Sequence, residues 1–186
     1  MNMIFLKYTF TFLLTLLTTH TVVSDALVPK IYPVPPVNEN SLFYIQRSKN
    51  TNAIVYEINR TPEGKIKAEE PIKIYWIRYS SDSTTEDLTL IQRKYAYGVN
   101  SRSYNGQQNS FVIQFLAYKK RNIFLLPKNN DKQYAAYINI NGKLAELKKI
   151  FISTSGGTFW FPIIDFVEIT GKDPVTHQVL VERFKP

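Results

Sequence analysis

The sequence predicts an all-β domain, an antiparallel barrel or sandwich of about eight to ten strands with at most one short helix. From Ser41 onward, apolar and polar residues alternate with a period of two, and β-branched and aromatic residues are frequent. Polar connections containing Gly, Asn or Pro separate these runs, whereas helical periodicity is nearly absent. We therefore expect residues 41–186 to form a single β domain.

Residues 1–24 have the features of a secretory signal peptide. Lys7 precedes the apolar run YTFTFLLTLL, and compact residues lead to a cleavage site after Ser24. A transmembrane anchor is the alternative, but threonines interrupt the run and it is too short to span a bilayer comfortably. We expect an exported chain, periplasmic or secreted, with no transmembrane segment after cleavage.

The chain is basic and contains no cysteine. Its formal net charge of +8 becomes +7 when Lys7 leaves with the signal peptide. A basic balance suggests nucleic acid, an anionic surface or an acidic ligand as partner, although scattered Lys and Arg also serve solubility alone. Export makes nucleic acid the least suitable of these. Without cysteine there is no disulfide framework, so the apolar core alone must stabilise the fold.

Residues 25–40 form a proline-rich leader. Pro29, Pro33, Pro35 and Pro36 fix φ and remove backbone donors, which favours an extended segment over a helix or a central strand. We interpret it as a tether or a strap lying on the domain, with a partner-binding segment as the alternative.

Ten runs have the composition and alternation of strands. In the clearest of them, Ile72, Ile74 and Trp76 share one face. The predicted strands are Leu42–Arg47, Ala53–Ile58, Pro71–Tyr79, Leu88–Tyr97, Phe111–Tyr118, Asn122–Leu126, Tyr134–Ile140, Ile150–Thr154, Ile163–Thr170 and Gln178–Phe184.

The sharpest turn signal is Asn141-Gly142, a dipeptide that tolerates positive φ at both positions of a tight hairpin. The best helix candidate follows it directly, at Lys143–Lys149 (KLAELKK). This segment consists of good helix formers but spans barely two turns, which is marginal unless it packs.

Several kinds of catalytic chemistry are disfavoured. After signal cleavage only one histidine is left, His177, in a polar connection where an exposed turn residue is the ordinary explanation. Zinc and copper sites recruit several His or Cys ligands, so we expect no metal of this kind and no cofactor. Ser155–Thr158 lacks the pattern of a phosphate loop, and Ser80–Asp87 lacks the spacing of a calcium loop.

Paired carboxylates are the catalytic arrangement that the composition leaves open. Glu168 and Glu182 flank the final turn, and two facing acids are what a glycosidase requires. Pairing of these acids with Lys172 or Arg183 across the hairpin is the structural alternative, and we favour it.

Aromatic residues are plentiful. Three consecutive rings at positions 159–161, including Trp160, cannot all point inward from a strand, so at least one faces solvent, another layer or a partner. Coverage of both faces by the leader or a loop is the alternative.

Four stretches, read together, resemble a bacterial family known as domain of unknown function 4833. They are LFYIQRSKNTNAIVYEIN at positions 42–59, IKIYWIRY at 72–79, LTLIQRKYAYGV at 88–99 and ITGKDPVTHQVLVERFKP at 169–186. The resemblance covers about positions 41–186. It implies a small exported protein of Gram-negative envelopes and carries over neither an activity nor catalytic residues.

The residues themselves suggest one binding site. Arg47, Asn50 and Asn52 crowd the connection between the first two predicted strands, with Tyr56 close in sequence. An Arg and amides converging at a strand end can bind an anionic or sugar group, whereas Asn residues are also common turn formers. Including the two tryptophans, the predicted ligand-binding residues are Arg47, Asn50, Asn52, Tyr56, Trp76 and Trp160.

We therefore interpret the chain as a non-enzymatic binding module of the bacterial envelope, whose partner is a small apolar, sugar or anionic ligand or an envelope protein. The alternatives are a carboxylate-dependent enzyme acting on envelope carbohydrate, and a structural envelope protein that docks partners through its leader or a sheet edge.

Overall fold

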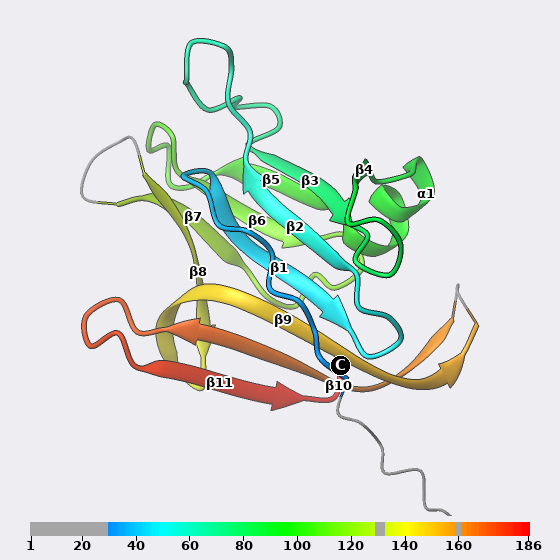
Figure 1. Cartoon of the computed structure of the whole chain (residues 1–186). Helices are drawn as coiled ribbons and strands as arrows, with labels where there is room; N and C mark the ends of the chain where they lie inside the picture. Colours follow the sequence, from blue (N-terminus) through cyan, green and yellow to red (C-terminus); the bar gives the residue numbers. More distant parts are fainter. Residues whose placement is uncertain (1–29, 129–132, 159–160) are drawn as a thin grey trace, which may run out of the picture. The chain divides into compact units, whose positions relative to one another are not determined.

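The long strand β9 (Lys143–Gly157) connects all parts of the sheet. Glu146 pairs with both Tyr137 of β8 (Tyr134–Ile140) and Lys172 of β10 (Pro162–Lys172). Ile150 pairs with both Ile45 of β1 (Ser41–Arg47) and Ile169 of β10. β8 and β1 therefore follow one another along one edge of β9, while β10 occupies the other edge (Figure 1).

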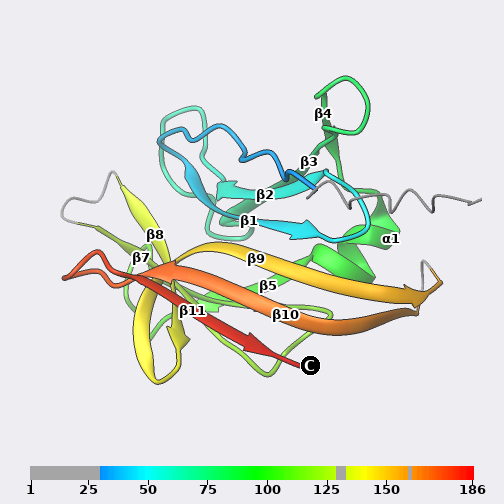
Figure 2. The ribbon, with the colours of Figure 1, turned by 60° about the horizontal axis from the view of Figure 1, so that its bottom comes forward.

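Two wings of the sheet start from that shared edge. The β1 wing continues through β2 (Ala53–Ile58) and β3 (Ile72–Ile77) to β4 (Thr85–Asp87). The β8 wing continues through β7 (Ile123–Pro127) and β6 (Phe111–Phe115) to β5 (Val99–Ser103). β11 (Val179–Phe184) extends β10, and Figures 1 and 2 show β9, β10 and β11 side by side.

The computed structural model describes residues 30–128, 133–158 and 161–186. Residues 31–186 form one compact unit. The predicted signal peptide, positions 25–29 of the leader and Trp160 lie outside the described residues. No helix within the described ranges is long and apolar enough to cross a membrane.

The two wings pack their inner faces together, so the curled sheet forms a half-barrel with a shared core. The ring of Phe43 stacks on Tyr56 with centroids 4.4 Å apart, and both rings meet Phe115 of β6 edge to face. The alternation expected from the sequence is present, since Ile72, Ile74 and Trp76 are all buried, whereas Lys73 between them is exposed. The class prediction of a mostly β domain is confirmed.

Leader residues 31–40 pack on the outer face of the β1 wing. The Gln46 amide donates to the carbonyl of Pro33, Tyr32 meets Phe151 edge to face at 5.1 Å, and the Asn38 amide donates to Glu57 at 2.6 Å. All six residues of β2 are buried, because the core lies on one side of the strand and the leader lies on the other.

Two segments have the opposite secondary structure to the one predicted. Residues of the predicted strand Leu88–Tyr97 form α1 (Leu90–Gln92) and the π-helical turn Arg93–Tyr97. The predicted helix Lys143–Lys149 is the first half of β9. Here the Asn141-Gly142 hairpin, with φ of 49° and 81°, pairs the segment with β8, and this pairing overrides a weak helix propensity.

The strand count and one strand direction also differ from the prediction. Within the described residues the sheet has eleven strands, because β4 and β5 form in segments expected to be connections. Both are short and polar, so their sequences lack the apolar alternation of the other strands. β1 pairs in parallel with β9, which makes the sheet mixed.

The two acids considered as a catalytic pair point to opposite faces of the β10–β11 hairpin. Glu168 is in register with Arg183, which donates to it at 2.7 Å. Glu182 is next to Arg183, so it faces the other way. Glu182 accepts from Arg121 and from the backbone N–H of Asn141, the latter at 2.9 Å. The hypothesis of a facing carboxylate pair is wrong at these positions, and each acid stabilises the sheet instead.

We expect replacement of Glu182 by Gln to reduce the pH dependence of stability. Hydrogen bonding to Arg121 lowers the pKa of Glu182 below its ordinary value of 4.5, against the opposing effect of burial. A lowered pKa means that the carboxylate stabilises the fold above that value and that this contribution is lost as the pH falls. In urea unfolding, Glu182→Gln should cost about 1–3 kcal/mol at neutral pH and should flatten the acid slope.

Glu70→Gln is the matched control for this variant, because Glu70 forms an exposed ion pair with Arg93. Exposed pairs contribute about 0–1 kcal/mol, so the control should follow the wild-type curve. An acid slope unchanged in Glu182→Gln would contradict the assignment.

Candidate functional site

Arg47 occupies the last position of an apolar row on β1. Phe43 and Ile45 are buried in the core, and Arg47 is the next residue on the same face. It is in register with Ile152 of β9. The strand therefore carries a half-buried guanidinium to the border of the core, at a place where the row would otherwise end in an apolar side chain.

Two aromatic rings surround the Arg47 guanidinium. Its central carbon lies 5.4 Å from the ring centroid of Trp76 and 5.6 Å from that of Tyr97. The two rings meet edge to face with centroids 5.4 Å apart, so the three groups form a nearly equilateral cluster. Such contacts stabilise a cation by about 0.5–2 kcal/mol, increasingly as water is removed. The rings orient the guanidinium without neutralising it.

The hydrogen-bonding capacity of Arg47 is incompletely used. Its Nε is buried and has no partner in the described part of the chain. The six ion pairs among the described residues do not include Arg47. Burial raises the pKa of the Tyr97 hydroxyl, and the charge of Arg47 and a hydrogen bond from Arg47 to that hydroxyl oppose the rise. A half-buried guanidinium whose buried Nε lacks an acceptor favours an anionic or strongly accepting group beside it.

A polar chamber of about 280 Å³ opens beside this cluster. Its walls come from the β1–β2 connection, from the ends of β3 and β4, and from the start of the helical turn. The lining residues are Arg47, Asn50, Asn52, Trp76, Arg78, Glu86, Asp87, Thr89 and Gln92. We call this the Arg47 pocket.

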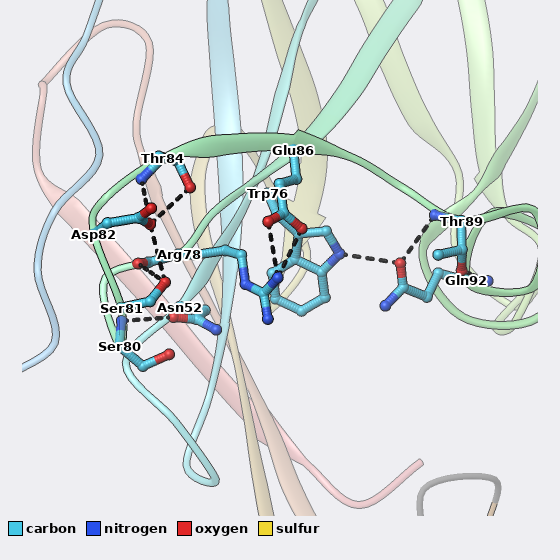
Figure 3. A network of polar contacts seen from close by, with 10 residues as sticks. All are labelled: Asn52, Trp76, Arg78, Ser80, Ser81, Asp82, Thr84, Glu86, Thr89 and Gln92. Atoms are coloured by element: carbon cyan, nitrogen blue, oxygen red, sulfur yellow. Dashed lines mark hydrogen bonds and ion pairs between the residues drawn. The ribbon is translucent and has the colours of Figure 1, made fainter.

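Hydrogen bonds hold the walls of the Arg47 pocket in place (Figure 3). Asn52 accepts from the backbone N–H of Ser80 at 2.9 Å, and both Glu86 oxygens accept from Arg78 at 2.8 Å. Asn50 accepts from the backbone N–H of Asn52 at 3.1 Å. The two asparagines thus use their oxygens for the turn, and their NH₂ groups are the donors that a ligand can use.

Gln92 links the helical turn to the tryptophan. Its side-chain oxygen accepts from Trp76 Nε1 at 3.3 Å and from the backbone N–H of Thr89 at 3.0 Å. Thr89 Oγ1 accepts in turn from the Gln92 N–H, which completes a capping box. The π-helical turn that follows ends at Tyr97, the second ring beside Arg47. One short helical segment therefore positions both aromatic neighbours of the guanidinium.

A second chamber, of about 520 Å³, shares Arg47, Asn50 and Gln92 with the polar one. It extends between the helical turn and the strands β9 and β10. Its other walls are largely apolar, and they include Tyr97, Ile152 and Ile164. Arg47 therefore stands where a polar and a mainly apolar space adjoin.

The structure brings together four of the six residues predicted from the sequence, namely Arg47, Asn50, Asn52 and Trp76. Tyr56 lies in the core, outside the pocket, and its hydroxyl donates to the Tyr97 carbonyl at 2.8 Å. Trp160 lies outside the described residues.

Sequence reasoning missed Tyr97 and Gln92, because the segment was interpreted as a strand. The Thr-x-x-Gln spacing of Thr89 and Gln92 is the capping signal that identifies this turn.

The remaining polar motifs have structural roles. Asp82 accepts from Ser81 and Thr84 within its loop, and the described residues contain no cluster of three or more His, Cys, Asp or Glu that could hold a metal ion. Residues 155–157 continue β9. His177 is exposed, with a φ of 58°, in the turn between β10 and β11.

These features define a mostly β domain with a curled sheet and an arginine-centred pocket at the end of its core. A family model, the domain of unknown function DUF4833, matches residues 43–183, and the chain belongs to this family. The resemblance noted in the sequence is confirmed, and every described residue of the Arg47 pocket lies within the matched region. No curated protein and no solved structure matches the chain.

We expect Gly98→Ala to disrupt the turn that carries Gln92 and Tyr97. A Cβ at residue 98 would lie 1.8 Å from the carbonyl oxygen of Arg93, so the backbone must move. The cost should be at least about 1–3 kcal/mol in urea unfolding, accompanied by a changed tryptophan emission spectrum as Trp76 loses its neighbours.

Gly156→Ala is the matched control, since its Cβ would meet only the Ile163 Cδ1, at 3.8 Å. Equal stability of the two variants would contradict a close approach at Gly98.

Proposed function

We propose that this chain is an exported, non-enzymatic binding module of the bacterial envelope, and that it holds a small ligand by an anionic group at Arg47. The observation that carries the proposal is the incomplete hydrogen bonding of the Arg47 guanidinium. It lies against two rings, its Nε lacks a partner and no described carboxylate pairs with it.

Partial burial of the Arg47 charge has an energetic cost. Removal of a cation from water is unfavourable unless hydrogen bonds or an opposite charge compensate it. Cation–π contacts compensate only part of this cost. A ligand carboxylate or phosphate would supply the missing acceptors, and Asn50 and Asn52 line the same pocket with amides whose oxygens already accept backbone hydrogen bonds. Such charge-assisted bonds are about twice as strong as neutral ones.

Support for export comes from the first residues of the sequence, and the envelope assignment follows from the family resemblance. A cysteine-free chain suits either an oxidising or a reducing compartment. The basic net charge of the mature chain is in keeping with an acidic ligand.

We expect Arg47→Met to lose binding of an anionic probe. Titration with anilinonaphthalene sulfonate, followed by its fluorescence, should show affinity falling at least about tenfold, which corresponds to the loss of one charge-assisted hydrogen bond. The variant should be as stable as the wild type or more so, because methionine continues the apolar row of β1 without burying a charge.

Arg102→Met is the control variant for this titration. Arg102 is an exposed residue of β5 and lines neither chamber. The Arg102→Met variant loses the same charge as Arg47→Met but keeps Arg47, so it should bind the probe as the wild type does. Equal probe affinity in the wild type and Arg47→Met would overturn the proposal, whereas equal losses in Arg47→Met and Arg102→Met would reduce the effect to net charge.

A further inference from the structure

A third cavity, of about 200 Å³, lies inside the half-barrel and is almost entirely apolar. Its walls come from β1, from the β6–β7 region and from the strands β8 to β11. They include Ile45, Phe115, Ile138, Ile150 and Val167. The exposed residues Ala117 and Pro186 also line it, so this apolar cavity is partly open to solvent.

This inner cavity adjoins the large chamber below Arg47. The two spaces share Ala96, Tyr97, Ala117, Ile152 and Ile164 in their walls. Two of these five residues are alanines, whose side chains occupy little of the space between the chambers. The mainly apolar chamber therefore lies next to Arg47 at one end and next to the inner cavity at the other.

The charged side chain that lines the inner cavity already has an ion-pair partner. Arg121 is the one charged residue among its described walls, and it donates to Glu182 and stacks on Phe184 at 4.5 Å. The inner cavity therefore provides no vacant charge for a polar ligand, whereas Arg47 does. A sugar or a dianionic ligand would bury unsatisfied hydroxyl or anionic groups at this end.

We infer that the ligand is a single straight aliphatic chain with an anionic head, bound with the head at Arg47 and the chain directed past Ala96 and Ala117 toward the inner cavity. This inference rests on the function proposed above and adds the chemical class of the ligand. The inner cavity, of about 200 Å³, has room for the end of one chain only.

The experiment is a calorimetric titration of the mature chain with butanoate, octanoate and dodecanoate, each below its micelle-forming concentration. Each buried methylene should raise the affinity about fourfold, which follows from the transfer free energy of a CH₂ group. The increase should stop once the chain fills both spaces. Dodecyl phosphate is compared with dodecanoate to distinguish a phospholipid-like head from a fatty acid, and tight binding of either supports the inference.

Ala117→Phe tests the path of the chain. Ala117 is exposed at the protein surface as well as lining both spaces, so the larger ring is compatible with folding. It should lower dodecanoate affinity about tenfold or more and butanoate affinity much less, because only the long chain must pass residue 117. Ala68→Phe, at an exposed loop position outside the cavities, is the matched control and should behave as the wild type.

The outcomes separate the two claims. Binding of all anions that depends on Arg47 but not on chain length would overturn the aliphatic-chain inference and leave the proposed function standing. Equal dodecanoate affinity in the wild type and Ala117→Phe would contradict the proposed position of the chain beside Ala117. Binding of no anion, or binding that is indifferent to Arg47→Met, would overturn both.

Discussion

The half-buried guanidinium of Arg47 is the constraint on which the site depends, because its buried Nε has no hydrogen-bond partner among the described residues. β1 alternates strictly, and its inner row of Phe43 and Ile45 is completed by Arg47 at the border of the core. A buried ion pair would neutralise the charge, but pairing with a protein carboxylate would also occupy its donors permanently. The fold instead places Trp76 and Tyr97 beside the guanidinium. The rings hold the cation, and Arg47 also hydrogen-bonds the Tyr97 hydroxyl, but its buried Nε has no partner among the described residues.

The sheet topology explains why these residues meet. Arg47 and Trp76 come from the β1 wing, whereas Tyr97 ends the helical turn that leads into β5 at the far end of the other wing. β9 joins the wings at one side only, through β1 and β8. On the opposite side, the segment from β4 through α1 to β5 connects the two ends of the path, and the Gln92 capping box fixes it to Trp76. The pocket is therefore built from the parts that close this side of the half-barrel.

The sequence was sufficient for those features that depend on local chemistry. Alternation identified β2, β3 and β8 because their apolar residues face a core, and Asn141-Gly142 identified the hairpin because few other dipeptides tolerate positive φ twice. Prediction from the sequence failed where neighbouring strands determine the secondary structure. The segment KLAELKK is a strand because β8 and β10 supply hydrogen bonds on both of its edges.

The same division applies to the site. Arg47, Asn50 and Asn52 are close in the sequence, and Trp76 was included as one of the two tryptophans. Tyr97 could not be found in this way, since its position beside Arg47 depends on the packing of one wing on the other. Even where a local signal existed, as in the Thr89 to Gln92 spacing, a β-rich composition around it favoured the wrong assignment.

Preorganisation is the reason to read this arrangement as a binding site and not as a defect of packing. The asparagines are fixed by backbone hydrogen bonds, and Gln92 holds Trp76 while the rings hold Arg47. A ligand bound as proposed would meet donors whose conformational entropy has already been lost in folding, which lowers the cost of binding. An unpaired buried Nε would be selected against if it served stability alone, because methionine or leucine could fill the same row. An acceptor on a ligand would satisfy the buried Nε of Arg47, and this residue lies where a polar and a mainly apolar space adjoin.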